Sequence, residues 1–179
     1  MRTVFTSKIR RLSFGRRVRV LYAALSAFIA IACVFGNRQI VVNTSPSVSP
    51  GLYVRTFAAP TVGHLIDFRI PPAAREYVKL RTGNNGLNWY ILKPIVAGPG
   101  DTVDTTGHGL IINGVNLGPM PPLKDSSGRV LPRWSAHRVL GLDEFFVYSS
   151  RISNSFDSRS YGPIRRGDIA AVRRPILTW

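Results

Sequence analysis

The sequence predicts a mainly β domain, built as a folded or barrel-like sheet, behind one N-terminal transmembrane helix. From residue 37 onward, short runs rich in β-branched and aromatic residues alternate with Gly, Pro and Asn turns every 8–12 residues or so, as in such sheets. Residues 20–36 form an uncharged apolar run. We therefore divide the 179 residues into a basic arm (1–19), a transmembrane anchor (20–36) and one domain (37–179).

The apolar run would make about 25 Å of helix, which is at the short end of what spans a bilayer. Seven Lys and Arg residues and no acid precede it, and positive residues stay on the cytoplasmic side. The arm should therefore lie in the cytoplasm and the domain outside. Two alternatives remain open. One is a cleaved signal peptide, although no small-x-small exit follows the run; the other is a lipoprotein-type site at Cys33, for which Ala30 is a poor match.

A net charge of +15 is compatible with binding to nucleic acid or to an anionic membrane. Beyond the arm, however, basic residues are scattered among the acidic ones. No basic stripe with interleaved aromatic residues and no zinc or helix-turn-helix spacing is present. We therefore expect no nucleic-acid partner. The single cysteine, Cys33, excludes a disulfide within the chain, so the core alone must hold the fold.

The first half of the domain predicts three short strands, a short helix and a fourth strand. These elements fall at residues 38–43, 52–57, 63–70, 73–80 and 89–96. Two prolines follow the third strand, and a Gly-Asn-Asn-Gly run ends the helix.

In the second half, residues 98–101 (Gly-Pro-Gly-Asp) turn the chain back, and residues 110–117 read as a hairpin because their central Asn-Gly suits a primed turn. Residues 118–138 contain four prolines and predict a loop excursion. Strands are then predicted at 142–148 and 168–172.

A stiff turn at residues 43–53, rich in Pro and Gly, follows the apolar run. Four aliphatic hydroxyl groups cluster in it, those of Thr44, Ser45, Ser47 and Ser49. By its residues alone this turn is either a linker or a site that carries a nucleophile.

A serine nucleophile needs a base. The three histidines (His64, His108 and His137) lie in no recognisable motif, and we read them as surface or turn residues. Lysine can act as a base where burial lowers its pKa. Of the four lysines, only Lys93 is flanked by apolar residues, and in a strand it would share a face with Ile91 and Ile95.

Three segments, in order, resemble the type I signal peptidases. Residues 47–52 (Ser-Val-Ser-Pro-Gly-Leu) are similar to the Ser-Met-x-Pro-x-Leu turn of that family, and Ser-x-x-x-Gly-Leu-Tyr at 47–53 is closer to its TraF-like branch, the signal peptidases of conjugative transfer systems. Residues 92–103 resemble the segment with the lysine base. Residues 154–163 resemble the Asn-Ser-x-Asp-Ser-Arg-Tyr-x-Gly signature. The resemblance covers residues 20–172.

The resemblance implies a signal-peptidase-type catalytic domain and assigns roles by position. Ser47 is the expected nucleophile, Lys93 the general base, Ser45 an oxyanion donor together with the Ser47 N–H, Ser155 the hydroxyl that orients the lysine, and Asp157 with Arg159 a supporting ion pair. Ser49 and Ser158 are alternatives for the nucleophile and the lysine partner, and Asp101 is read as a turn residue. Residues 157–159 have the alternative of an exposed turn with a weak salt bridge.

Three departures from the family pattern bear on substrate preference. Val48 stands where the family has Met, His64 replaces a common acid, and Ser160 intervenes before Tyr161. None of them removes an expected catalytic group.

The resemblance implies a membrane-anchored serine endopeptidase with a Ser/Lys dyad that processes exported precursors after small residues. Its substrate would be a conjugative pilus subunit precursor, with a role in maturation or cyclisation. We expect a single-pass protein of the bacterial inner membrane with a periplasmic catalytic domain. Its partners would be the precursor and membrane lipid, with no cofactor and no metal.

Two other functions are weighed against this one. A LexA-like self-cleaving protein would use the same Ser/Lys pair, but the apolar run argues against a soluble protein of that kind. A non-enzymatic basic membrane protein that binds nucleic acid or anionic lipid would explain the charge, but not the three ordered motifs.

Overall fold

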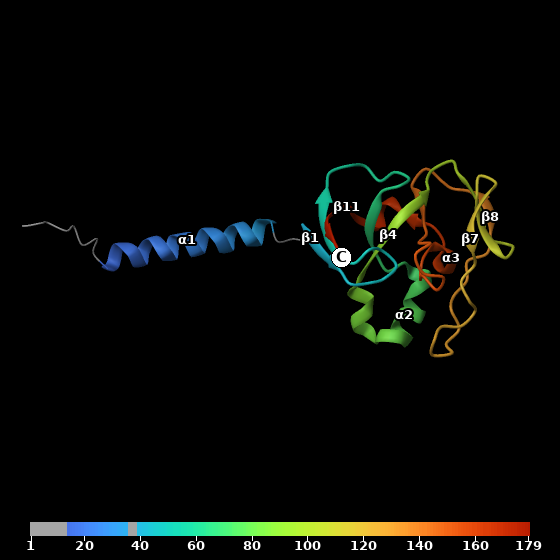
Figure 1. Ribbon diagram of the computed structural model, residues 1–179, viewed down its shortest axis with the longest axis horizontal. Helices are drawn as coiled ribbons and strands as arrows, with labels where there is room; N and C mark the ends of the chain where they lie inside the picture. The colour runs from blue at the N-terminus through green and yellow to red at the C-terminus, as the bar shows by residue number, and fades with distance from the viewer. Residues whose placement is uncertain (1–13, 36–38) are drawn as a thin grey trace, which may run out of the picture. The chain divides into compact units, whose positions relative to one another are not determined.

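The computed structural model describes residues 14–35 and 39–179, which belong to two compact units (Figure 1). Residues 1–13 and 36–38 lie outside the described residues. They comprise most of the predicted arm, the last residue of the predicted anchor and the first two residues of the predicted domain.

In the first unit, helix α1 (Phe14–Phe35) begins inside the predicted arm, six residues before the apolar run. Large apolar side chains along α1 are more than half exposed, among them Leu21, Phe28 and Ile31. Within the described ranges, no helix combines the length and the apolar character needed to cross a membrane. The transmembrane anchor therefore stays a prediction.

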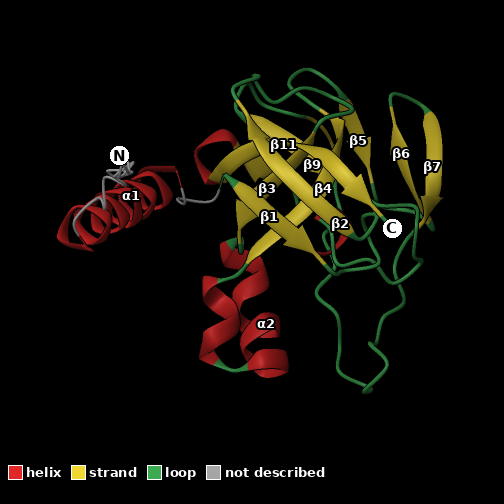
Figure 2. Cartoon of the chain, turned by 60° about the vertical axis from the view of Figure 1, so that its left-hand side comes forward, coloured by secondary structure: helices red, strands yellow, loops and turns green. Residues whose placement is uncertain are grey.

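The second unit, residues 40–179, is mainly β, as predicted, and its described strands form two antiparallel sheets (Figure 2). The larger sheet has the order β1-β2-β11-β3-β4-β9-β10 and the smaller one the order β7-β6-β5-β8. The strands are β1 (Ile40–Asn43), β2 (Gly51–Thr56), β3 (Leu65–Arg69), β4 (Tyr90–Ala97), β5 (Thr102–Asp104), β6 (Gly109–Ile112), β7 (Val115–Pro119), β8 (His137–Val139), β9 (Glu144–Val147), β10 (Ile164–Arg165) and β11 (Ile169–Thr178). The helices are α2 (Arg75–Thr82) and α3 (Ser158–Tyr161), with 3-10 turns at Pro72–Ala74, Asn84–Asn88 and Arg166–Asp168.

Local chemistry explains the elements that the sequence predicts well. Asn113 and Gly114 both have positive φ angles, of 49° and 82°, which a primed two-residue hairpin turn requires between β6 and β7. Gly83 ends α2 with a φ of 68°, and its N–H donates to the carbonyl of Lys79. The predicted hairpin and the predicted helix end are therefore confirmed.

Strand β4 lies inside the larger sheet, between β3 and β9. Lys93, Ile95 and Ala97 alternate as its buried residues, so the expectation that Lys93 shares an apolar face with Ile95 is confirmed. The register places Lys93 opposite Ile66 of β3. The sheet therefore carries the lysine into the interior of the domain.

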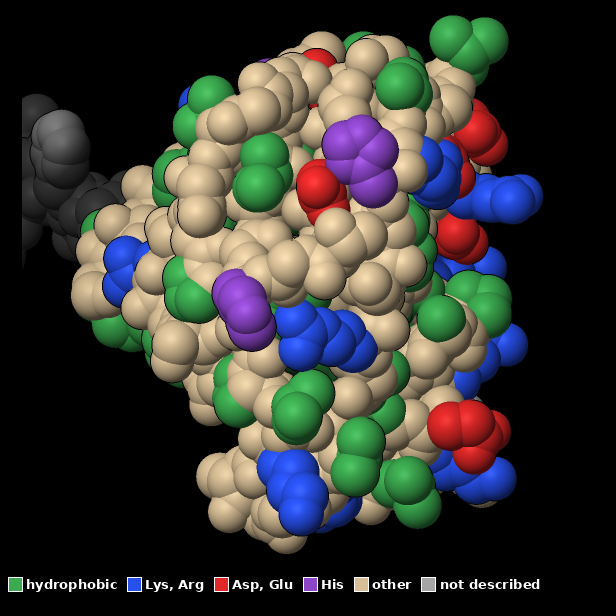
Figure 3. Space-filling model, turned by 90° about the vertical axis from the view of Figure 1, so that its right-hand side faces the viewer, with side chains coloured by type: hydrophobic (Ala, Val, Ile, Leu, Met, Phe, Trp, Pro, Cys, Tyr) green, Lys and Arg blue, Asp and Glu red, His purple; other side chains and the backbone are tan. Residues whose placement is uncertain are grey.

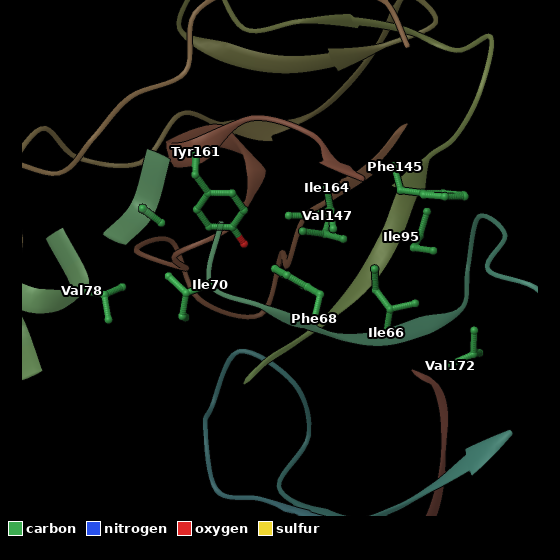
Figure 4. Packing of buried hydrophobic residues seen from close by; sticks show 11 residues of the cluster. Ile66, Phe68, Ile70, Val78, Ile95, Phe145, Val147, Tyr161, Ile164 and Val172 are labelled. Atoms are coloured by element: carbon green, nitrogen blue, oxygen red, sulfur yellow. The ribbon is translucent and has the colours of Figure 1, made fainter. Parts of the chain in front are cut away.

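A hydrophobic cluster fills the space beside the larger sheet (Figure 4). Phe68 of β3, Ile95 of β4 and Val147 of β9 meet Tyr161 of α3 and Val78 of α2 in it. A second hydrophobic cluster lies around β5 and β6. Burial of apolar side chains in both clusters stabilises the fold. The loop excursion predicted at residues 118–138 is mostly loop, but its first two residues end β7 and its last two begin β8. Tyr77 of α2 donates to Asp125 within it at 3.0 Å.

The last strand is a correction, because β11 continues six residues beyond the predicted end at Val172. The Arg173-Arg174-Pro175 sequence is typical of the end of a strand, because two charged residues precede a proline. In the fold, Arg173 is buried and forms an ion pair with Asp67 at 2.8 Å, and the register with β2 shifts after Pro175. The sequence does not predict strands β5, β8 and β10, because runs of two or three residues carry no readable alternation.

Gly51, at the start of β2, lies against the end of β11. A Cβ atom there would come within 2.2 Å of the carbonyl oxygen of Leu177, so only glycine permits this close approach of two backbones. This contact holds the start of β2, which follows directly after the serine-rich turn, against the end of β11.

Candidate active site

The turn between β1 and β2, residues 44–50, is here named the serine turn. Asn43, the last residue of β1, donates from Nδ2 to the carbonyls of Ser45, Val48 and Ser49 at 3.0, 2.9 and 3.2 Å. Tyr53 donates its hydroxyl to the Ser49 carbonyl at 2.5 Å. Because two side chains hold three carbonyls, the turn has a defined shape although it lies outside the sheets.

Ser47 is the buried hydroxyl of the serine turn, with 4% of its surface exposed. Its Oγ lies 3.0 Å from Oγ of Ser45. Its carbonyl accepts a hydrogen bond from the hydroxyl of Ser149, which follows β9. Ser47 is thus held on its side chain and on its backbone by two other serines.

Lys93 is buried on β4, with 4% of its surface exposed, and donates from Nζ to Oγ of Ser155 at 3.0 Å. Burial lowers the pKa of Lys93 from 10.5 to about 8, the nearby Asp157 carboxylate acts in the opposite direction, and Arg159 lowers the pKa further. With a pKa of about 8, roughly a tenth of the amine is uncharged at pH 7. That fraction can accept a proton from a hydroxyl.

Asp157 and Arg159 form a buried ion pair behind the lysine, with nitrogen–oxygen distances of 2.8 and 2.9 Å. Arg159 also donates to the carbonyls of Ser155 and Pro119 and lies over the ring of Tyr148. The alternative of an exposed turn with a weak salt bridge is therefore wrong, because both side chains are at most 1% exposed. The pair fixes the backbone of Ser155, the partner of Lys93.

Two cavities, of about 630 and 560 Å³, adjoin Ser47. Pro94 and Val96 of β4 line the first cavity, and Ile91 and Leu92 line the second. The residues on both sides of Lys93 thus lie beside the serine turn. Among the hydrogen bonds of the described residues, none joins Ser47 Oγ directly to Lys93 Nζ; Ser47 Oγ bonds to Ser45 and Lys93 Nζ to Ser155.

The histidines lie elsewhere. His64 contacts Thr61 and the carbonyl of Ala59, His137 pairs with Asp104 at 3.0 Å, and His108 is exposed. No histidine is among the residues that line either cavity beside Ser47 in the described part of the chain.

The alternative serines and Asp101 have other contacts. Ser158 accepts from the N–H of Val147 at 3.0 Å, so the structure brings Ser155 rather than Ser158 to Lys93. Ser49 lines the larger cavity beside Ser47, and its carbonyl accepts from Tyr53. Asp101 accepts from Gly98 N–H and from the Asn113 amide, as expected of a turn residue.

Sequence reasoning missed Asn43 and Ser149. An Asn directly before a turn commonly bonds to the backbone of that turn, so Asn43 was recognisable. Ser149 had no local signal, because the carbonyl that it binds is 102 residues away in sequence.

Comparisons with known proteins identify the class. The family described as signal peptidase, peptidase S26, matches residues 14–178, which is nearly the whole chain. The chain therefore belongs to the S26 signal peptidases and is a serine-type peptidase.

Within this class it is a TraF-like, conjugation-related signal peptidase. Two plasmid transfer proteins TraF from Escherichia coli are 33% and 36% identical to it over 147 and 146 residues, covering 77% of this chain and 82% of each relative. A signal peptidase I from Leptolyngbya laminosa is 30% identical over 115 residues, covering 63% of this chain and 50% of that protein.

Proposed function

We propose that this protein is a membrane-anchored endopeptidase that cleaves exported precursors with Ser47 as nucleophile and Lys93 as general base. The observation that carries the proposal is the environment of Lys93. It is a buried lysine with a pKa lowered to about 8, on the strand whose neighbouring residues line both cavities beside Ser47. Such a lysine can deprotonate a serine near neutral pH.

In this mechanism Lys93 takes the proton of Ser47 Oγ as that oxygen attacks the scissile carbonyl. The Ser45 hydroxyl and the Ser47 N–H stabilise the negative charge that develops on the carbonyl oxygen. Protonated Lys93 then gives its proton to the leaving amine, and water hydrolyses the acyl-enzyme by the same route. Ser155 orients the Lys93 amine, and the ion pair between Asp157 and Arg159 supports Ser155.

The substrate that we propose is the precursor of a conjugative pilus subunit, cleaved after small residues at the first and third positions before the scissile bond. The plasmid transfer proteins among its relatives support this choice. A step that cyclises the pilus subunit would follow if its amine, rather than water, resolved the acyl-enzyme.

We place the catalytic domain at the outer face of the bacterial inner membrane, tethered by the segment that contains α1. The basic arm before the apolar run and the exposed apolar side chains of α1 support this placement. If α1 is an anchor, the full chain will stay with membranes after carbonate washing, whereas release into the wash would contradict the anchor.

The deciding experiment is cleavage of a co-expressed precursor with an Ala-x-Ala site by the full chain. We expect cleavage by the wild type, and a loss of about a thousandfold or more with Ser47→Ala or Lys93→Met. The exposed residues Lys79 and Ser135 provide matched controls, since Lys79→Met and Ser135→Ala should retain activity. Activity that survives Lys93→Met would exclude the proposed mechanism.

The competing function, binding of nucleic acid or anionic lipid without catalysis, receives less support. On the face shown in Figure 3, Lys and Arg side chains lie in separate groups among acidic and hydrophobic ones. Tight, salt-sensitive DNA binding by residues 38–179 without any precursor cleavage would favour that function instead.

A further inference from the structure

The larger cavity beside Ser47, of about 630 Å³, has one charged residue in its lining, as far as the described residues show. That residue is Arg151, which follows β9 and is exposed. The remainder of the lining is neutral and includes Val48, Pro94 and Tyr148. The proposed dyad does not use Arg151, so the role of this cation is unassigned.

The guanidinium of Arg151 is held at the serine turn. Its Nε donates to the carbonyl of Pro46, the residue before Ser47, at 3.3 Å. The described residues offer its two terminal nitrogens no hydrogen-bond acceptor and no carboxylate within ion-pair distance. Four N–H donors therefore remain free beside the proposed nucleophile, in the geometry that binds a carboxylate.

Because both cavities adjoin Ser47, an extended substrate would place one side of the scissile bond in each cavity. The second cavity, of about 560 Å³, is lined by strand residues of β1 and β4, among them Val41, Ile91 and Leu92, and by α2 residues that include Arg81. Small apolar residues before the scissile bond suit the apolar strand residues of this cavity. The segment after the scissile bond would then enter the cavity that holds Arg151.

We propose that Arg151 binds a carboxylate on the leaving segment of the substrate, and so selects precursors with an acidic group shortly after the scissile bond. This inference rests on the proposed function, because it requires cleavage at Ser47. The carboxylate has two possible sources, an Asp or Glu side chain or the free C-terminus of a short leaving segment. Both present the same chemistry to a guanidinium.

The test uses the full chain in detergent and three peptides with one small-x-small site. The first has a neutral leaving segment that ends in an amide. The second is the same peptide with a free C-terminal carboxylate, and the third has an internal Asp and an amide end. The wild type should cleave the second or the third with a kcat/KM about tenfold above the first, as for a hydrogen bond to a charged group. Which of the two is preferred identifies the source of the carboxylate.

In Arg151→Gln the preference should fall to about one, and in Arg151→Lys part of it should remain. The ratio between peptides within each variant removes any general loss of activity caused by the lost Pro46 contact. Arg75→Gln, which removes an exposed arginine that lines neither cavity, is the charge-matched control and should keep both the activity and the ratio. Raising the salt concentration should reduce the wild-type ratio, because screening weakens an exposed pair.

Equal cleavage of all three peptides by the wild type would overturn the inference and leave the proposed function standing. A preference for acidic peptides that survives Arg151→Gln would also overturn the inference. So would a preference that is lost in Arg81→Gln, because Arg81 lines the second cavity and the carboxylate would then bind there. A wild type that cleaves none of these peptides and no precursor would overturn the proposed function and this inference with it.

Discussion

Lys93 shows how one residue can lower stability and supply chemistry at the same time. Among the described residues, Ser155 is the one hydrogen-bond partner of its amine, in an otherwise apolar part of β4. Burial favours the uncharged amine, so the folded protein binds the proton of Lys93 more weakly than the unfolded chain does. The lowering of the pKa from 10.5 to about 8 corresponds to an unfavourable contribution of about 3 kcal/mol to the free energy of folding at neutral pH.

The pH dependence of activity follows from the same pKa. Because only uncharged Lys93 can accept the proton of Ser47, kcat/KM should rise with pH and reach half its maximum near pH 8. Asp157→Asn removes the charge that raises this pKa, so the half-maximum should move to lower pH. The measurement is kcat/KM for a peptide substrate between pH 6 and 10. A half-maximum near pH 10.5 would mean that burial does not lower the pKa of Lys93.

The free energy of unfolding should also depend on pH through the lowered pKa of Lys93. Between about pH 8 and 10.5 the unfolded lysine is protonated and the folded one is not, so the free energy of unfolding should increase as pH rises through this window. Lys93→Met should lack this increase and should be more stable than the wild type at pH 7, by up to about 3 kcal/mol. Denaturant unfolding of both proteins at pH 7 and pH 10 measures the difference. A less stable Lys93→Met at pH 7 would contradict the account.

At the scale of elements, the candidate site depends on segments that are distant in sequence. The serine turn joins β1 to β2, the lysine comes from β4, and the ion pair lies at the start of α3. The backbone N–H of Trp179, beyond β11, donates to the carbonyl of Pro50 at 3.1 Å. The segment after β9 reaches the same turn through Ser149. Besides its own flanking strands β1 and β2, the turn is thus held by the segments that follow β9 and β11.

Ser149 links the serine turn to the ion pair, because its hydroxyl binds the Ser47 carbonyl and its N–H points to Asp157 at 3.4 Å. Ser149→Ala should release the turn and lower kcat by about ten- to a hundredfold through misplacement of Ser47, with KM changed by less than about twofold. Ser149→Thr keeps a hydroxyl and should restore most of kcat, and Ser153→Ala, at an exposed serine, is the control. An unchanged kcat in Ser149→Ala would show that the turn holds its shape without this bond.

At the scale of the whole molecule, every residue assigned to the candidate site lies in the compact unit of residues 40–179. Both hydrophobic clusters lie in the same unit. The unit therefore has its own core and its own chemistry. No described residue of α1 belongs to either cluster or to the candidate site.

A chain that starts at Gln39 should therefore fold and cleave a soluble peptide with a kcat/KM within about threefold of the full chain, because nothing in the core or site is removed. It should no longer cosediment with membranes. Circular dichroism, peptide cleavage and vesicle sedimentation test the three parts of this prediction. An unfolded product would show that the N-terminal segment is required for folding, and undiminished sedimentation would place the membrane contact on the domain itself.

Local patterns were enough to predict most strands, the helix at α2 and the primed turn at Asn113 and Gly114. Each of these depends on neighbours within a few residues, through alternation of apolar side chains or through a required φ angle. Lys93 was selected in the same way, by its apolar flanks. The nucleophile could not be selected in this way, because Ser45, Ser47 and Ser49 are serines in the same turn. Only the family resemblance distinguished Ser47 from the other two.

The sequence by itself therefore determined the mainly β class, the family and a short set of candidate residues. Tertiary structure decided where β11 ends and how Ser47 and Lys93 are held. Arg173 pairs with Asp67, 106 residues away, and Ser149 with Ser47, 102 residues away. The tertiary structure also decided that Asp157 and Arg159 are buried, and that Arg151 lies at the cavity beside the serine turn. The physical reason is that burial, and the pKa shift that burial causes, depend on which distant segments pack together, whereas turns and alternation depend on neighbours along the chain.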